Sequence, residues 1–149
     1  MVELMGRLLR QHRRIALDTS VFIYQFEANP RYTQSTQFIF AWLERSMHSA
    51  VTSTITMTEL LVQPYRASDS DRVDAFYGLL TTYPNLEWIA PDLRIADMAA
   101  QLRAQYGIRT PDALQAATAI SAGASLFISN DRAFRQVKEL VTLLLDDLA

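Results

Sequence analysis

Short apolar segments alternate with longer helical stretches along the chain, and this alternation is the strongest limit on how its 149 residues can fold. The segments expected to form strands are residues 15–17, 50–53, 86–89, 126–128 and 141–145. The segments expected to form helices are residues 18–25, 30–46, 54–62, 69–82, 91–106, 110–123 and 130–137. Such alternation favours parallel strands joined by right-handed crossovers. We therefore expect an α/β fold, a three-layer α/β/α arrangement around a central parallel sheet of four to five strands.

Cap and breaker residues set several of the expected helix ends. Pro64 follows Gln63 and is expected to stop the helix that begins at residue 54, because proline removes a backbone donor and clashes with the preceding turn. Gly107 is suited to close the helix of residues 91–106 as a C-terminal cap. Thr110 is expected to cap the next helix, with proline at its first position.

The chain shows no linker, internal repeat or low-complexity tract, so residues 1–149 are expected to form a single domain. Residues 1–14 read as a short basic amphipathic lead-in before the first strand. No apolar run is long enough to span a bilayer, and the first residues do not form a signal peptide. We therefore expect a protein of the cytoplasm that makes no use of a membrane.

Composition excludes several classes of site. The absence of cysteine excludes disulfide scaffolds, thiolate zinc sites and cysteine nucleophiles. With only four glycines, the chain has no glycine-rich loop of the known nucleotide-binding types. The formal net charge is −2, so the chain is not basic as a whole, and nucleic acid would have to bind a local basic surface. Thirteen of the fourteen basic residues are arginine, which grips phosphate with two donors.

Acidic residues stand where ligands of a parallel sheet usually bind, beyond the carboxyl ends of the strands. Asp18 directly follows the expected strand of residues 15–17, and Asp131 comes after Ser129 and Asn130 at the end of the expected strand of residues 126–128. Glu59 and Asp112 lie early in helices that can face the same edge. Four converging carboxylates would repel one another unless a cation bound them. All-oxygen ligands select Mg²⁺ or Mn²⁺, and such an ion suits phosphodiester hydrolysis.

Neutral polar residues beside these acids are expected to orient the carboxylates or hold water without ligating the ion. They are Thr19, Ser20, Ser129 and Asn130. Each acid also has a purely structural interpretation. Asp18 and Asp131 can be helix N-caps, Asp112 can be a first-turn acid, and Glu59 can complete a capping box with Thr56.

Four segments together resemble the PIN-domain nucleases, and in size the chain is most similar to the VapC-type toxins of that family. The segments are residues 17–23, 58–60, 110–119 and 128–134. The resemblance implies an endoribonuclease dependent on Mg²⁺ or Mn²⁺, with Asp18, Glu59, Asp112 and Asp131 as its catalytic and metal-binding residues. It further implies a homodimer and a small antitoxin partner. The lead-in of residues 1–14 departs from the family, whose members often begin within a few residues of the first strand.

Arginines near the acidic edge are the candidates for contact with RNA, namely Arg109, Arg132 and Arg135. The alternative for each is a solvated or intrachain-paired side chain. The helix containing residues 38–43 is apolar all around, so either a partner or the rest of the chain covers its second side.

Other functions fit less well. A haloacid-dehalogenase phosphatase needs an acid at position 20, which is serine, and a receiver domain needs a lysine at a strand end, whereas Lys138 lies in a terminal helix. Two alternatives remain open: a PIN nuclease of RNA processing or surveillance without an antitoxin, and a non-catalytic nucleic-acid-binding PIN module.

Overall fold

Five parallel strands form the centre of the protein in a computed structural model that describes residues 2–45 and 47–148. The strands are β1 (Arg14–Leu17), β2 (Ser49–Ser53), β3 (Leu86–Ile89), β4 (Leu126–Ser129) and β5 (Thr142–Leu144). Their order across the sheet is β3-β2-β1-β4-β5, and every pair is parallel. The expected parallel sheet is confirmed. Residues 1, 46 and 149, which include the expected domain limits and one expected helix end, lie outside the described residues.

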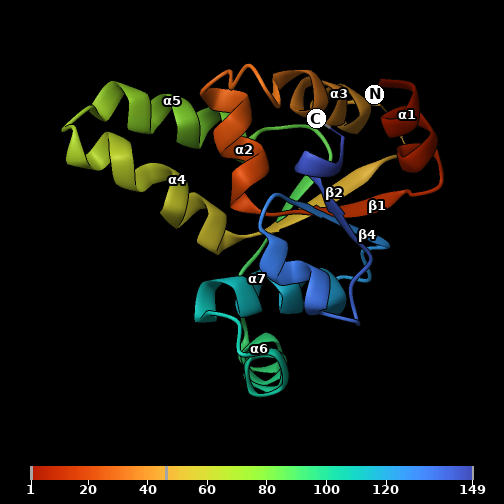
Figure 1. Cartoon of the computed structure of the whole chain (residues 1–149). Coiled ribbons are helices and arrows are strands. Elements are labelled where there is room, and N and C mark those ends of the chain that lie inside the picture. Colours follow the sequence, from red (N-terminus) through yellow and green to blue (C-terminus); the bar gives the residue numbers. More distant parts are fainter. Residues whose placement is uncertain (1, 46, 149) are drawn as a thin grey trace.

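The described part of the chain has seven α-helices, and helices lie on both faces of the sheet (Figure 1). They are α1 (Val2–Arg10), α2 (Thr19–Phe26), α3 (Thr33–Leu43), α4 (Thr54–Arg66), α5 (Ser70–Thr81), α6 (Leu93–Tyr106) and α7 (Thr110–Ser121). Two short 3₁₀ helices, η1 (Arg132–Gln136) and η2 (Leu145–Asp147), flank β5. The three-layer α/β/α architecture is therefore confirmed.

The side chains of the central strand β1 alternate between the two faces of the sheet, and each face carries its own hydrophobic core. Ile15 and Leu17 point to the face covered by α1, α2 and α3, whereas Ala16 points to the face covered by α6 and α7. The small residue at position 16 faces the alanine-rich side of α7, whose Ala113 and Ala116 are completely buried. These short side chains allow α7 to approach the sheet closely, and this places its N-terminus near the end of β1.

The lead-in segment folds as α1 and packs against α3. Met5 and Leu9 are completely buried in the same core cluster as Ile39 and Leu43 of α3. Both sides of the apolar helix α3 therefore find neighbours within the chain. This supports the intrachain interpretation of its apolar surface over the expectation that a partner covers it.

The expectation that Pro64 ends the fourth helix is wrong, because α4 continues through Pro64 to Arg66. A proline removes one helical donor, but the next turn is closed by the backbone N–H of Ala67, which donates to the carbonyl oxygen of Gln63 at 3.0 Å. Pro64 is buried, so packing offsets part of the penalty of an interior proline. Proline thus remains within the helix instead of terminating it.

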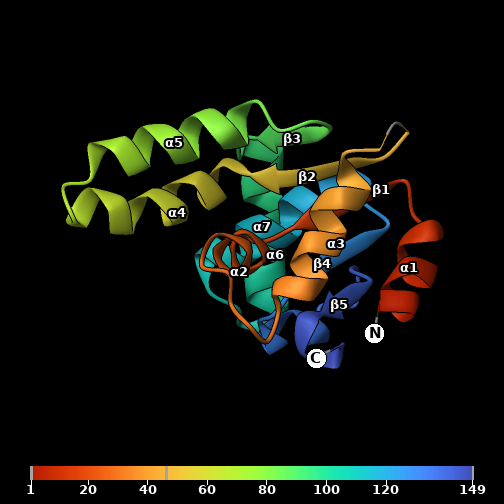
Figure 2. The same ribbon diagram turned by 90° about the horizontal axis from the view of Figure 1, so that it is seen from above.

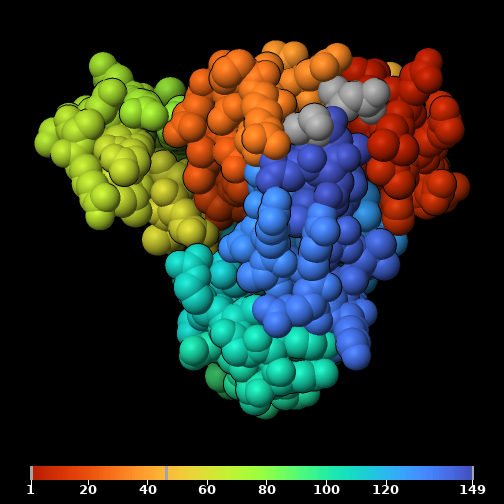
Figure 3. Space-filling view, viewed as in Figure 1, coloured from red at the N-terminus to blue at the C-terminus, as the bar shows by residue number. Residues whose placement is uncertain are grey.

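Helices α4 and α5 lie side by side and extend from the body of the molecule (Figures 1 and 2). The space-filling view shows this hairpin projecting beside α2 (Figure 3). Within residues 2–45 and 47–148, no helix has the length and hydropathy needed to cross a bilayer.

Candidate active site

The topology brings two acidic residues to one point at the carboxyl edge of the sheet. Strand β1 pairs with β2 on one side and with β4 on the other, so the strand order reverses between β1 and β4. Leu17 is the register partner of Ile128, and this places Asp18 next to the Ser129–Asp131 turn. Ligands of open α/β sheets bind at such a reversal.

Asp18 is a buried carboxylate, with 7% of the residue exposed. It caps α2 by accepting a hydrogen bond from the backbone N–H of Ser20 at 3.0 Å, and it also accepts from the hydroxyls of Ser20 and Ser129. Burial raises the pKa of Asp18 from 3.8 to about 6, with a smaller contribution from the negative charge of Asp112. The helix-capping role expected for Asp18 is confirmed. Among the described residues, the buried carboxylate of Asp18 accepts hydrogen bonds from neutral donors only and forms no ion pair.

Asp112 lies close enough to this carboxylate to raise its pKa, and Asp131 acts in the same way on Asp112. Burial is the main cause of the raised pKa of Asp112, and the charge of Asp131 raises it further. Asp131 caps η1 by accepting from the backbone N–H of Ala133 at 2.9 Å. Asp112 lies in the first turn of α7, where Arg109, and not the expected Thr110, occupies the N-cap position. The charge of Asp112 therefore acts on Asp18, and the charge of Asp131 acts on Asp112.

Glu59 lies in the second turn of α4 and is exposed. Its Oε1 accepts a hydrogen bond from the hydroxyl of Thr19 at 2.7 Å, and this bond ties α4 to the start of α2. The expected capping box is wrong, because Ser53 is the N-cap of α4 and Thr56 lies inside the helix. Glu59 is thus held on the same edge as Asp18 through the residue that follows Asp18.

The four expected positioning residues all contact this edge. Ser129 donates to Asp18 and accepts from the backbone N–H of Asp131 at 3.0 Å, so one hydroxyl bridges two of the acids. Ser20 donates to Asp18 and accepts from the backbone N–H of Asn130 at 3.1 Å. The side chain of Asn130 is itself held by Tyr24 and by the backbone N–H of Asp146. These bonds hold the turn after β4 against the turn after β1.

Beneath the acids lies a buried polar network that the sequence analysis missed. Gln115 of α7 donates to the hydroxyl of Thr56 at 2.9 Å, and Thr56 lies 2.8 Å from the hydroxyl of Thr52, which donates to the carbonyl oxygen of Leu17 at 2.8 Å. All three side chains are buried. The available signal was a polar residue at position 115 on the alanine-rich inner face of its helix. The network connects α7, α4, β2 and β1 under the site.

Removing the amide of this network is expected to destabilise the protein. We expect Gln115→Ala to lower the free energy of unfolding by about 1–3 kcal/mol, because Thr56 loses its buried donor. Urea denaturation measures the change. The matched control is Gln101→Ala, which removes an exposed amide bonded only to Asp97 and should change stability by less than about 0.5 kcal/mol. Equal effects of the two substitutions would contradict a structural role for the network.

The candidate RNA-binding arginines differ in their surroundings. Arg109 is exposed and pairs with Asp112, its Nε lying 3.3 Å from Oδ2. Arg135 forms an ion pair with Asp147, which is the alternative to RNA contact that the sequence analysis gave for this residue. Arg132 is exposed, and its charge helps to lower the pKa of Asp146. Arg109 is the only one of these three that contacts one of the four acids in the described structure.

The donor set fits a hard divalent cation in its chemistry. Every candidate ligand is a carboxylate oxygen, and the buried charge of Asp18 has no cationic side chain as partner within residues 2–45 and 47–148. In the same part of the chain, no three acidic or histidine side chains already lie in position around a common point for an ion. Side-chain rotation would therefore have to accompany binding.

Comparison with known proteins agrees with this architecture. The family model described as the PIN domain matches residues 15–140. No curated protein sequence matches the chain.

Solved structures share the fold at low sequence identity. VapBC2 from Rickettsia felis, bound to a DNA fragment from its promoter, is 18% identical with a TM-score of 0.71 and covers 88% of this chain and 98% of its own. DNA-bound VapBC from Salmonella typhimurium is 21% identical with a TM-score of 0.67, covering 89% and 98%. A toxin-antitoxin complex from Klebsiella pneumoniae is 22% identical with a TM-score of 0.63, covering 86% and 96%. At these identities the comparison establishes the fold.

Proposed function

The chain belongs to the PIN-domain family, whose members are nucleases, and from this premise we propose that it is a metal-dependent endoribonuclease that acts in the cytoplasm as the toxin of a VapBC-type pair. The observation that carries the proposal is the carboxylate of Asp18. It is buried at the strand-order reversal, its pKa is raised to about 6, and Asp112 adds to that increase. A buried negative charge without a cationic partner is most readily stabilised by a bound cation.

Asp18, Glu59, Asp112 and Asp131 are the residues that would hold Mg²⁺ or Mn²⁺. When bound, the ion would lower the pKa of a water molecule and offset charge on the phosphodiester during displacement. The protein supplies the orientation of the ligands. Ser20 and Ser129 direct the two oxygens of Asp18, and Thr19 directs Glu59.

Arg109 is proposed to contact RNA. Its guanidinium is exposed and lies beside Asp112, so it can exchange its intrachain partner for a phosphate close to the acidic edge. Arg132 is exposed at the start of η1, directly after Asp131, and is also proposed to contact the phosphate backbone. Arg135 would have to leave Asp147 to do the same.

An antitoxin partner is supported by an apolar hollow of about 260 Å³ between α2, α3 and α5. Phe26, Phe40 and Leu79 line it, and half of Leu79 is exposed. Exposed apolar surface of this kind favours a protein ligand. Homodimerisation is proposed as well, supported by Leu93 at the start of α6, which is 88% exposed.

The proposed activity has a direct test. We expect the purified protein to cleave a structured RNA in Mg²⁺ or Mn²⁺, to lose that activity in chelator, and to regain it when the ion is returned in excess. Gel analysis of end-labelled RNA measures cleavage at internal sites. Binding without cleavage in any divalent ion would favour a non-catalytic nucleic-acid-binding module, and cleavage unaffected by chelator would contradict the proposed chemistry. If purified protein cleaves RNA but no small protein copurifies with it or inhibits it, the result favours RNA processing without an antitoxin.

A further inference from the structure

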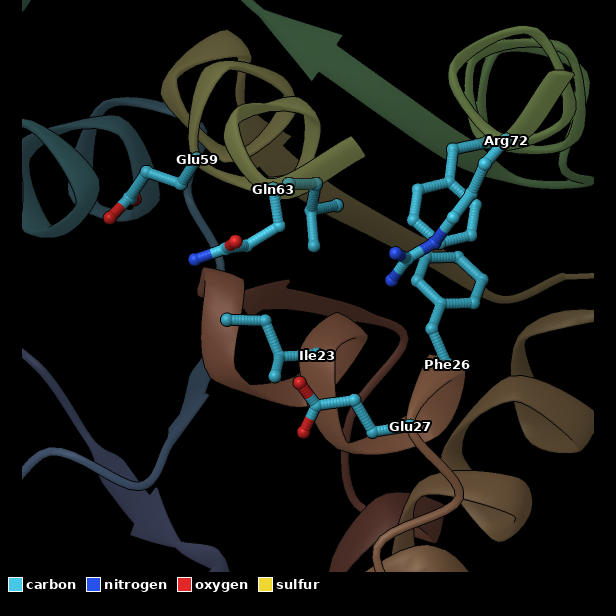
Figure 4. Close-up of a pocket in the computed structure, with 8 residues that line it drawn as sticks. Ile23, Phe26, Glu27, Glu59, Gln63 and Arg72 are labelled. Atoms are coloured by element: carbon cyan, nitrogen blue, oxygen red, sulfur yellow. The ribbon is translucent and has the colours of Figure 1, made fainter. Parts of the chain in front are cut away.

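A cavity of about 90 Å³ lies between α2 and the α4–α5 hairpin, and Glu59, one of the four acids, is among the residues that line it (Figure 4). Glu59 lines one end, and Arg72 and Phe76 line the other. Gln63 lies between them, one helical turn after Glu59 on the same face of α4. We call this cavity the α2–α4 trough. Because Glu59 is also one of the four acids, the trough lies beside the proposed catalytic edge.

The far end of the α2–α4 trough is a stack of flat groups. The rings of Phe26 and Phe76 are parallel within 15°, with their centroids 4.7 Å apart. The guanidinium of Arg72 lies over Phe76, with its central carbon 5.1 Å from the ring centroid. RNA-binding proteins use aromatic rings and arginine planes to stack unpaired bases. This end of the trough therefore offers a further planar group a surface to stack on.

Two polar side chains line the α2–α4 trough without a hydrogen-bond partner in the described part of the chain. Glu27 follows the last turn of α2, and Gln63 lines the same cavity from α4, with Ile23 between the two side chains in the view of Figure 4. Both residues are exposed. Their acceptors and donors are thus free to meet the edge of a ligand.

The charges in the α2–α4 trough select against a phosphate group. Glu27 and Glu59 would both repel an anion, whereas Glu27 can accept hydrogen bonds only from N–H or O–H groups. At the other end, the positive charge of Arg72 would repel an arginine side chain of a protein partner. A neutral, planar ligand with an edge of donors fits this combination, and among RNA components that ligand is a nucleobase.

We propose that the α2–α4 trough binds the guanine base of a nucleotide next to the cleaved phosphate. Guanine alone among the four bases presents two adjacent donors, N1–H and the 2-amino group, which match the two oxygens of one carboxylate. Glu27 accepts both, Gln63 donates to the remaining base acceptors, and the Arg72 plane stacks on the ring. The identity of the ligand as RNA and its position next to the cleaved phosphate rest on the proposed function, whereas the choice of guanine rests on the lining of the trough.

The test measures binding separately from cleavage. Fluorescently labelled oligouridines that carry one guanosine, inosine, adenosine or cytidine are titrated against the Asp112→Asn variant in Mg²⁺. We expect guanosine to bind roughly tenfold or more tightly than adenosine or cytidine, and inosine, which lacks the 2-amino group, to fall between them. Adding Glu27→Gln should remove the preference, because an amide supplies one acceptor. Adding Glu3→Gln, the same change on α1, should leave it intact.

Each outcome separates the two proposals. Equal binding of the four oligonucleotides, or a guanosine preference that survives Glu27→Gln, overturns the assignment of the trough while leaving the nuclease proposal standing. A Glu27-dependent guanosine preference in a protein that cuts no RNA supports the guanine site but contradicts both the nuclease proposal and the placement of the base beside a cleaved phosphate. If Glu27→Gln instead weakens only an arginine-containing peptide, the trough belongs to a protein partner and the assignment is wrong.

Discussion

Replacing Asp18 with asparagine is expected to abolish RNA cleavage and, at the same time, to stabilise the metal-free protein. The loss of activity should be about 10³-fold or more, because a bound cation contributes several kcal/mol to the stabilisation of the transition state. The asparagine keeps an acceptor for the N–H and hydroxyl of Ser20, so the cap of α2 survives. A gain in stability accompanied by a loss of function distinguishes a functional carboxylate from a merely capping one.

The gain in stability follows from the pKa of Asp18, which burial raises from 3.8 to about 6. The folded protein binds this proton more tightly than the unfolded chain does. The stabilisation that the protonated carboxyl of Asp18 gives the folded state is therefore fully present below about pH 4 and is lost as the pH rises through 6. At about 1.4 kcal/mol per pKa unit, the ionised carboxylate costs up to about 3 kcal/mol. Asp18→Asn should therefore exceed the wild type in stability at pH 7 and match it near pH 4.

Thermal and urea denaturation across this pH range measure the difference in chelator. The matched control is Asp74→Asn, a surface carboxylate on α5, which should change neither activity nor the pH profile. An Asp18→Asn protein that is less stable than the wild type at pH 7, or that still cleaves RNA at the same chelator-sensitive rate, would contradict the role assigned to Asp18.

Asp112→Asn is expected to have the second large effect, a loss of cleavage of about 10³-fold or more with the fold retained. Asp112 projects from the first turn of α7 and makes its only described hydrogen bond with Arg109, so little packing depends on its charge. Mn²⁺ should raise the melting temperature of the wild type by preferential binding to the folded state, and this increase should shrink in the variant.

Arg109→Gln separates the two partners of this ion pair. In the wild type, Arg109 Nε lies 3.3 Å from Asp112 Oδ2. The Arg109→Gln substitution removes this ion pair but leaves the carboxylate of Asp112 in place. We therefore expect KM for RNA to rise while kcat and the response to Mn²⁺ persist. If Asp112→Asn and Arg109→Gln have the same modest effect, Asp112 serves mainly as the partner of Arg109 and does not bind an ion.

The acids could be located from sequence because their placement depends on local chemistry that sequence shows. Asp18 and Asp131 follow apolar strand segments, and both are helix caps, so their position at the carboxyl edge followed once the strands were expected to be parallel. Asp112 followed from the Thr-Pro-Asp start of its helix. In these cases local hydrogen bonding and the proposed function require the same residue type.

The missed features depend on tertiary packing. Gln115 could equally well have faced solvent, and only the close approach of α7 to the sheet buries its amide against Thr56. Pro64 lies inside α4 and is buried, whereas the sequence-based expectation considered only the tendency of proline to end a helix. The packing of α1 on α3 likewise depends on Met5 and Leu9 meeting residues distant in sequence. The distances among the four acids depend on side-chain rotation, which sequence does not specify.

The most direct test of a shared cation at the acidic edge is anomalous diffraction from crystals soaked in Mn²⁺. A shared cation predicts one or two manganese peaks at the carboxyl ends of β1 and β4, in contact with Asp18 and with at least one of Asp112, Asp131 and Glu59. Saturating soaks that leave this edge without a peak, or that place manganese only elsewhere on the molecule, would contradict it.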